Sequence, residues 1–186
     1  ILMPVYNERA YLRPCLERVL AAPLPEGLVR EVVLVDDGST DGTAELVDAL
    51  AVQYAPAVRA IHQAENQGKG AAIQRAIAEM RGQYAIFQDA DLEYDPEEYT
   101  NVLKPLLAGR ADVVYGSRFA PSTMRRVLNY HHQLGNQFLT FLSNLFTGLN
   151  LTDMETCYKA FRADVLKTIP VWSRRFGIEP EITAKE

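Results

Sequence analysis

A repeated unit of apolar run, polar turn and helical pattern constrains the fold of this chain most strongly. In the clearest unit, residues 31–35 are apolar after the first position, an Asp- and Gly-rich turn covers 36–42, and a helical pattern covers 43–54. An uninterrupted apolar run is typical of a parallel strand that is covered on both faces. Repeated strand–turn–helix units predict an α/β protein with a mainly parallel central sheet, flanking helices and right-handed crossovers.

The other apolar runs and helical spacings extend this pattern along the chain. Strands are expected at 1–5, 58–61, 84–88 and 112–115, and helices at 8–22, 71–81, 96–107 and 133–149. In such sheets, ligands bind outside the carboxyl ends of the strands. Polar clusters follow four of the expected strands, at 7–8, 36–37, 89–91 and 116–118. We therefore expect the functional site at this edge of the sheet.

Composition excludes several classes of protein. The 186 residues include 48% hydrophobic side chains, enough for one domain with a sizeable core. The net charge of −5 argues against nucleic-acid binding, for which a basic domain is expected. Cys15 and Cys157 are too few for a disulfide framework and lack zinc-ligand spacing, so reduced thiols in the cytoplasm are expected.

The two ends indicate a piece of a longer protein. No apolar run approaches the ~20 residues that span a bilayer, and no signal peptide is present. The chain begins without methionine inside an expected strand and ends without a stop signal. We expect a single domain over residues 1–186, truncated at both ends, and a membrane segment beyond its carboxyl end stays open.

Asp89 and Asp91 carry the most informative chemistry. They follow the apolar run at 84–87, and residues i and i+2 of a strand project to the same face. Two such carboxylates repel each other unless a cation lies between them or one is protonated. A hard divalent ion that also binds substrate phosphates fits such a pair. An isolated Asp-x-Asp is more often two solvated loop residues, so the rest of the chain must add weight to the motif.

Five motifs together resemble family 2 glycosyltransferases of the GT-A fold. They are Pro-Val-Tyr-Asn-Glu at 4–8, Val-Asp-Asp-Gly-Ser at 35–39, Asn-Gln-Gly-Lys-Gly at 66–70, Asp-Ala-Asp at 89–91 and Gly-Ser-Arg-Phe at 116–119. The segments 152–159 and 176–181 are similar to the polyprenyl-phosphate branch, which includes dolichyl-phosphate mannose synthases. The resemblance implies inverting transfer of a sugar from a UDP- or GDP-linked donor to undecaprenyl or dolichyl phosphate, in cell-envelope glycan biosynthesis.

The resemblance also implies which side chains hold the nucleotide. They are Pro4, Tyr6, Glu8, Asp36, Asp37 and Lys69. One of the two aspartates would accept hydrogen bonds from the base, although the turn that contains them also favours helix capping. Taken alone, Tyr6 indicates a core residue. The glycine loop at 66–70 offers amides at a helix start, and we expect it to shape the nucleotide pocket more than to grip phosphate.

A divalent cofactor, Mg²⁺ or Mn²⁺, is expected on Asp91. Asp89 would position the sugar or the metal, and Glu93 is either a further ligand or a solvated charge. The metal and nearby cations would stabilise the negative charge that develops on the leaving nucleoside diphosphate.

The expected acceptor, a lipid monophosphate, is already mostly ionised near neutral pH, because its second pKa is about 6. It needs cations that hold it in line more than it needs a strong base. Arginine suits phosphate geometry, so Arg118 is the first choice, with Arg125, Arg126 and Lys159 as helpers. Asp153 lies at the position that the related branch assigns to catalysis, where it would orient the acceptor or a cation, or act as a weak base. Lys159 would pair with it.

The segment 133–149 is amphipathic, with apolar residues near helical spacing. It is either a membrane-facing helix that guides a polyprenyl chain, at the cytoplasmic face of the membrane, or a core-packing helix. Glu179 and Glu181 are expected to make structural ion pairs.

Two other functions stay open. One is a family 2 transferase with a saccharide or other hydroxyl acceptor, which would need a true base. The other is a non-catalytic nucleotide-sugar-binding domain. The oligomeric state and the identity of the sugar are not predicted.

Overall fold

The computed structural model describes residues 1–117, 130–175 and 177–185. Its first sheet is parallel, in the order β1 (Leu2–Val5), β2 (Val32–Asp36) and β3 (Val58–His62). Its second sheet has the order β4 (Tyr84–Ile86), β6 (Lys159–Arg162) and β5 (Val113–Tyr115), and β6 runs antiparallel to both neighbours.

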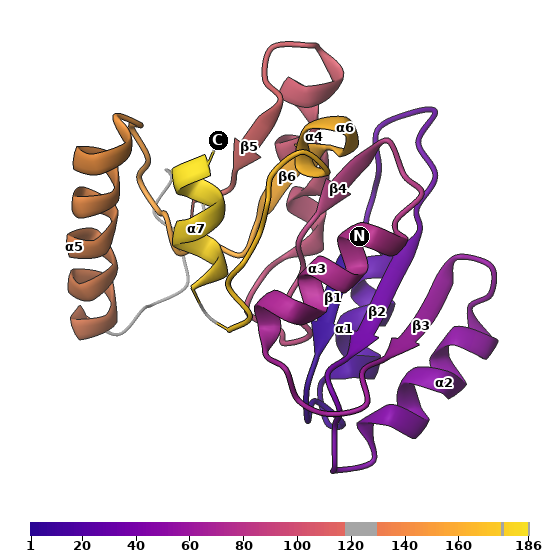
Figure 1. Cartoon of the computed structure of the whole chain (residues 1–186). Helices are drawn as coiled ribbons and strands as arrows, with labels where there is room; N and C mark the ends of the chain where they lie inside the picture. The colour runs from indigo at the N-terminus through magenta and orange to yellow at the C-terminus, as the bar shows by residue number, and fades with distance from the viewer. Residues whose placement is uncertain (118–129, 176, 186) are drawn as a thin grey trace.

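The two sheets join through the end of β4. Phe87 forms a parallel bridge with Leu2, and the Gln88 amide donates to the Leu2 carbonyl at 3.0 Å. The strand order across the described residues is therefore β3-β2-β1-β4-β6-β5, with β6 alone reversed (Figure 1). The predicted α/β architecture with a mainly parallel sheet is confirmed.

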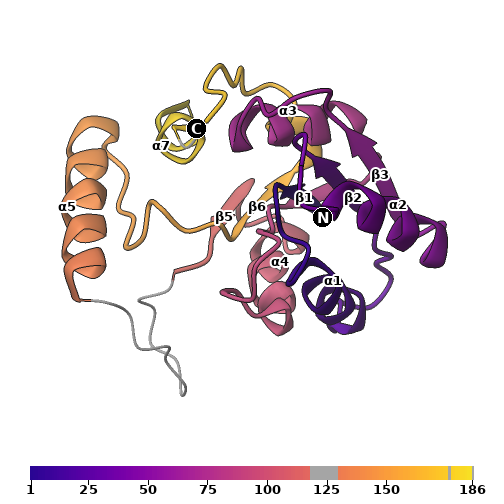
Figure 2. The same ribbon diagram turned by 90° about the horizontal axis from the view of Figure 1, so that it is seen from below.

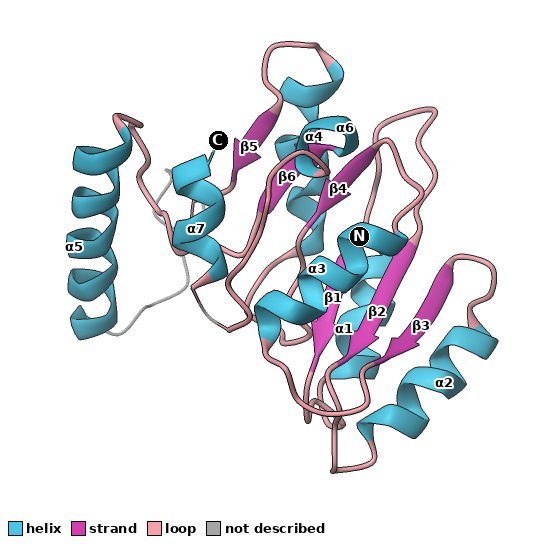
Figure 3. Cartoon of the chain, in the orientation of Figure 1, coloured by secondary structure: helices cyan, strands magenta, loops and turns pink. Residues whose placement is uncertain are grey.

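Helices cover both faces of this sheet (Figures 2 and 3). On one face lie α1 (Leu12–Ala21), α2 (Thr43–Gln53) and α4 (Tyr99–Leu107), the last preceded by the 3₁₀ turn η1 (Pro96–Glu98). On the other lie α3 (Lys69–Glu79), α6 (Ala163–Leu166) and α7 (Ile178–Lys185). The helix α5 (Tyr130–Thr147) stands apart from the sheet, beyond α7, in both views.

Strand residues alternate between the two cores, as the period of a strand requires. Leu34 packs with the α1 and α4 side, whereas Val33 and Val35 pack with the α3 and α7 side. Every residue of β2 is buried, which explains why its sequence is an unbroken apolar run.

The expected strands and helices are present with small shifts of their ends, but β6 and the helices α6 and α7 were not predicted. Residues 9–11 form a turn, so the first helix begins at Leu12 and not at 8. The strand β6 was not predicted at all. It reads Lys-Ala-Phe-Arg, and a charged residue at each end conceals a strand whose first three residues are buried.

The start of α3 packs against the segment 172–175 with no space for a side chain. A Cβ added to Gly70 would overlap the Ser173 carbonyl oxygen, and one added to Gly68 would overlap the Arg174 carbonyl oxygen. The Ala71 amide also donates to the Arg174 carbonyl at 3.0 Å. The glycines therefore let a distant segment of the chain close over the loop at 66–70.

This contact predicts the effect of Gly70→Ala. The added methyl group must displace the 172–175 segment, so we expect the free energy of unfolding to fall by about 2 kcal/mol, as for other overpacked sites. Gly135→Ala in α5 is the control, because no described atom outside its own helix backbone lies within 4 Å of its added Cβ. Urea unfolding of both variants measures the difference, and equal stability of the two would contradict the close packing.

Candidate active site

A cleft of about 540 Å³ lies at the carboxyl ends of β1, β2 and β4. It brings together seven of the predicted site residues: Pro4, Tyr6, Glu8, Asp37, Lys69, Asp89 and Asp91. Tyr6 is 45% exposed on this cleft, so its interpretation as a core residue is wrong. A second cavity, of about 380 Å³, lies at the amino ends of the strands around Ile1 and Tyr84. None of the predicted site residues that the structure describes lines this second cavity.

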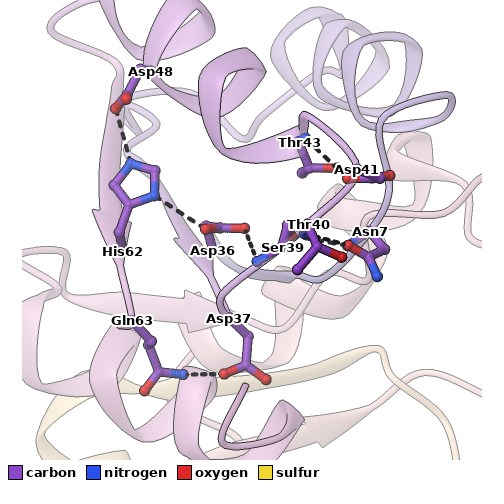
Figure 4. Close-up of polar contacts among 10 residues, drawn as sticks. All are labelled: Asn7, Asp36, Asp37, Ser39, Thr40, Asp41, Thr43, Asp48, His62 and Gln63. Carbon is purple, nitrogen blue, oxygen red and sulfur yellow. Dashed lines mark hydrogen bonds and ion pairs between the residues drawn. The ribbon is translucent and has the colours of Figure 1, made fainter. Parts of the chain in front are cut away.

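Asp37 ties the end of β2 to the start of α3. Asp37 is 2% exposed, and its carboxylate accepts a hydrogen bond from Gln63 Nε2 at 2.7 Å (Figure 4). It also accepts from the Gln67 amide at 2.8 Å and the Gly68 amide at 2.7 Å. Two amides of the glycine loop therefore bind a carboxylate of the protein itself. This agrees with the prediction that the loop shapes the pocket more than it grips phosphate.

Asp36 is equally buried but points away from Asp37 (Figure 4). One oxygen accepts from the Ser39 amide at 3.3 Å, and the other lies 3.2 Å from His62 Nδ1. The other ring nitrogen of His62 lies 2.9 Å from Asp48. Asp36 is absent from the cleft lining, so of the two aspartates it is Asp37 that faces the predicted nucleotide pocket.

The pairing of His62 predicts a pH dependence of stability. Burial acts to lower the pKa of His62, and the hydrogen bonds to Asp48 and Asp36 outweigh it, so the pKa lies above its usual value. A group whose folded pKa is raised contributes stability that is full below about pH 6.5 and is lost as pH rises through the folded pKa. We expect the free energy of unfolding to decline as pH rises from about 6.5 through the folded pKa of His62, and we expect His62→Gln to remove this decline. Urea titrations of both proteins across the interval measure it, and parallel curves would contradict the assignment.

The loops after β1 and β2 are held together by Asn7. Its side-chain oxygen accepts from the Thr40 backbone amide at 2.8 Å, and its backbone amide donates to the Ser39 hydroxyl at 2.9 Å. Asn7 has a φ of 55°, a conformation that asparagine tolerates better than most residues. This clamp fixes the β1 loop that carries Tyr6 and Glu8 into the cleft.

The carboxylate of Asp89 already forms an ion pair with a lysine, so it is not fully available to a metal ion. Lys69 Nζ lies 2.8 Å from Asp89 Oδ1 and 2.8 Å from Glu179 Oε1 of α7. Burial acts to lower the pKa of Lys69, but the neighbouring Cys157, Asp89 and Glu179 outweigh it and hold that pKa well above its usual value. The ammonium of Lys69 thus supplies part of the positive charge that relieves repulsion between Asp89 and Asp91. Glu179 makes the structural ion pair that was expected of it.

Asp91 and Glu8 form the acidic part of the cleft. Burial and the charges of Asp89 and Glu93 raise the pKa of Asp91, although the Glu93 amide donates to it at 2.8 Å. Burial and nearby aspartates, Asp91 foremost, also raise the pKa of Glu8. The side chain of Glu93 is exposed, and the residue is not part of the cleft lining.

Carboxylate oxygens that repel one another at a cleft are suitable ligands for a hard divalent cation. Among the described residues, no three His, Cys, Asp or Glu side chains are close enough to hold a metal ion by themselves. The residues present therefore fit a metal of the magnesium type, which uses one or two carboxylates and completes its coordination with substrate phosphates and water.

Two of the residues predicted for the acceptor end, Asp153 and Lys159, lie in the described part of the chain, and both are buried. Asp153 is 1% exposed and accepts from Asn136 Nδ2 of α5 at 2.7 Å. Lys159 is equally buried, and its ammonium donates to the carbonyls of Met154, at 3.0 Å, and Thr156. Burial lowers the pKa of Lys159 to about 8. Arg118, Arg125 and Arg126 lie outside the described residues.

Arg175 is a cleft residue that the sequence reasoning missed. It lines the same cavity as the carboxylates, because the segment 172–175 closes over Gly68. The sequence offered one signal, the basic pair at 174–175 directly before the motif at 176–181. Only the packing of that segment on α3 brings one of the two arginines to the cleft.

Glu181 holds this segment in place. It accepts from the backbone amides of Trp172 at 2.8 Å and Ser173 at 2.6 Å, and it pairs with Lys185. Burial acts to raise the pKa of Glu181, but Lys185 and the hydrogen bonds from residues 172–173 outweigh it and lower the pKa to about 2. The expected structural ion pair of Glu181 is confirmed.

The fold and the cleft define an α/β protein that presents carboxylates and cations at the carboxyl edge of its sheet. The sequence profile described as glycosyl transferase family 2 matches residues 1–169. The chain belongs to this family, and the predicted family and GT-A fold are confirmed.

Named relatives resemble nearly all of the chain. It is 35% identical over 170 residues to an undecaprenyl-phosphate 4-deoxy-4-formamido-L-arabinose transferase of Shewanella sediminis, covering 91% of this chain and 49% of the relative. It is 32% identical over 172 residues to a polyprenol monophosphomannose synthase of Mycolicibacterium smegmatis, covering 91% and 63%. The chain thus spans about half to two thirds of the length of these relatives.

A solved structure shares the fold. Glucosyl-3-phosphoglycerate synthase of Mycobacterium tuberculosis, in complex with Mn²⁺, UDP and glucosyl-3-phosphoglycerate, superimposes with a TM-score of 0.70 at 22% identity. The match covers 97% of this chain and 61% of that one.

Proposed function

We propose that residues 1–186 are one catalytic domain of a metal-dependent, inverting glycosyltransferase that moves a sugar from a UDP- or GDP-linked donor to a polyprenyl phosphate. The observation that carries the proposal is the cleft, where Asp91 and Glu8 meet Tyr6, Lys69 and Arg175 at the edge expected for a nucleotide. The relatives named as undecaprenyl-phosphate and polyprenol transferases support the acceptor class.

At the donor end, Asp91 would hold Mg²⁺ or Mn²⁺ together with the diphosphate of the donor. The Mn²⁺ and UDP in the related solved structure support this choice. The metal supplies charge stabilisation to the leaving nucleoside diphosphate. Arg175 adds a second cation at the same cleft, Tyr6 presents an exposed ring for the nucleotide, and Asp89 accepts hydrogen bonds from the sugar while Lys69 orients it.

At the acceptor end, the phosphate oxygen attacks the anomeric carbon in line and the configuration inverts in one step. Asp153 orients the acceptor through α5, since its carboxylate already holds Asn136. Arg118, Arg125 and Arg126 stay predictions for the acceptor phosphate. Lys159 would act indirectly, because its ammonium donates to backbone carbonyls of the 154–156 loop and so holds that loop in place.

The helix α5 supports a membrane location. Several of its polar residues face the protein, although Gln137 is exposed: Asn136 and Thr140 are buried, and Asn144 Nδ2 donates to the Leu151 carbonyl at 2.8 Å. Its apolar residues face outward in the described structure, including Phe141 at 62% and Phe146 at 83% exposure. This orientation supports the membrane-facing alternative, in which the helix lies in a membrane interface. None of the described helices is long and apolar enough to span a bilayer.

Phe146→Ser tests this surface. Loss of one phenylalanine from the lipid contact weakens vesicle binding by about tenfold to a hundredfold, since burying such a side chain stabilises by about 1.5–3 kcal/mol. Val52→Ser in α2 is the control, because Val52 is also exposed, at 81%, but lies on another helix. Sedimentation with vesicles that contain polyprenyl phosphate measures binding. Equal binding of both variants would contradict a membrane role for α5.

An assay of sugar transfer to polyprenyl phosphate tests the proposed function. The full-length protein is incubated with UDP- and GDP-sugars, Mg²⁺ or Mn²⁺, and a short polyprenyl phosphate. Metal-dependent formation of a lipid-phosphate sugar is the expected result and identifies the donor. Transfer only to a hydroxyl acceptor, with complete loss of turnover in Asp153→Asn, would favour the alternative enzyme. Metal-dependent donor binding without any turnover would favour a non-catalytic domain.

A further inference from the structure

Charges of alternating sign connect the donor cleft with the acceptor side of the molecule. In order they are Asp89, Lys69, Glu179, Lys159 and Asp153, which we call the charge row. The first three are joined by contacts of 2.8 Å. Lys69, Glu179 and Lys159 line one small cavity of about 10 Å³. Electrostatic interactions of Lys159 with Glu179 and Asp153 complete the row.

Glu179 has the central place in this row. Its side chain is 13% exposed, less than that of Lys69 at 17% or Asp89 at 25%. It lies in the first turn of α7, where the helix dipole stabilises a carboxylate. In the figures, α7 lies between α3, which carries Lys69, and α5, which contacts Asp153. Glu179 is therefore half-buried between the two ends of the site and is not part of the cleft lining.

Glu179 and Asp89 share the ammonium of Lys69. An ammonium held by Asp89 alone would cancel the charge of that aspartate, because opposite charges in contact away from bulk water interact strongly. A second carboxylate on the opposite side of the ammonium divides its charge between the two. Asp89 then keeps negative character toward the cleft, beside Asp91 and Glu8, where a divalent cation has to bind.

We propose that Glu179 is a positioning residue of the donor site: through Lys69 it orients Asp89 and keeps the cleft negative enough to bind a divalent metal with the nucleotide. This inference rests on the proposed function. It assigns a donor-site role to a residue about ninety positions away in the sequence from Asp89. A purely structural ion pair would instead contribute to stability and leave the metal dependence unchanged.

The test measures nucleotide binding to the full-length protein by calorimetry over a series of Mn²⁺ concentrations, with UDP and with GDP. Glu179→Gln keeps the size of the side chain and removes its charge. We expect the Mn²⁺ concentration for half-maximal nucleotide binding to rise about tenfold, which is about 1.4 kcal/mol. At saturating Mn²⁺, kcat should stay within about threefold of wild type.

The control is Glu31→Gln, because Glu31 also makes a partly buried ion pair, with Arg59 at 2.9 Å, at the other end of the sheet. Both variants should lose stability in thermal unfolding, and only Glu179→Gln should change the Mn²⁺ dependence. A second test repeats Glu179→Gln in a Lys69→Met background. If Glu179 acts through Lys69, its effect there falls to less than about threefold.

Each outcome is informative. An unchanged Mn²⁺ dependence of Glu179→Gln, in a wild-type protein that binds nucleotide with metal, overturns the inference alone. An equal effect in the presence and absence of Lys69 overturns the route through that lysine. A wild-type protein that binds neither UDP nor GDP with Mn²⁺ overturns the proposed function and the inference together. If Lys69→Met does not fold, the comparison with Glu31→Gln decides.

Discussion

Replacing Asp91 by asparagine lowers kcat/KM for sugar transfer by about a thousandfold, or about 4 kcal/mol of transition-state stabilisation. The substitution keeps the shape of the side chain and removes one charge. Asp89 is already bound by Lys69, so its carboxylate cannot replace that of Asp91 without breaking an ion pair of 2.8 Å. The expected measurements are transfer rates at several Mn²⁺ concentrations and nucleotide binding by calorimetry. Nucleotide binding to Asp91→Asn should no longer depend on the metal.

Glu97→Gln is the matched control for Asp91→Asn. Glu97 is an exposed carboxylate in the 3₁₀ turn six residues further on, and it is not part of the cleft lining. Its removal should change kcat/KM by less than about twofold. Metal-dependent transfer at a wild-type rate by Asp91→Asn would show that another residue holds the metal and would contradict the proposed donor site.

Replacing Asp37 by alanine lowers the free energy of unfolding by about 3 kcal/mol. The change leaves the amides of Gln67 and Gly68 and the Gln63 side chain without their acceptor, in a place where Asp37 is 2% exposed. A hydrogen bond to a charged group contributes about 1.5–3 kcal/mol, and buried unsatisfied donors carry a further cost. Urea unfolding followed by circular dichroism measures the loss.

The same variant should also bind nucleotide much more weakly, because the loop that Asp37 holds forms one wall of the cleft. Asp48→Ala is its control: Asp48 is 67% exposed, and its contact is with His62. That variant should lose less than about 1 kcal/mol. A loss in Asp37→Ala no larger than in Asp48→Ala would show that the amides of the glycine loop find other partners.

Local patterns were sufficient to predict most elements of the fold. Period and propensity are properties of neighbouring residues, so β2 was predicted from its apolar run and α3 from its helical spacing. The strand β6 was missed for the same reason. Lys159 is polar in sequence, and it becomes an interior residue only because the carbonyls of the 154–156 loop accept its ammonium hydrogens.

The site was predicted as a set of residues but not as a set of contacts. The convergence of Glu8, Asp37, Asp89 and Asp91 followed from the rule that parallel strands direct their carboxyl ends to one edge. Lys69 was predicted for the nucleotide, and the structure places its ammonium on two carboxylates. No spacing rule connects Asp89 with Glu179, because their shared contact with Lys69 depends on how α7 packs against α3.

The sequence by itself therefore determined the α/β class, the edge of the sheet that carries the site, and the acidic and basic residue types found there. Each follows from local periodicity and from the direction of parallel strands. Only the tertiary structure decided which charges neutralise one another, which arginine enters the cleft, and which face of α5 turns outward. These depend on contacts between distant segments, where burial and ion-pair geometry decide which partner each side chain takes.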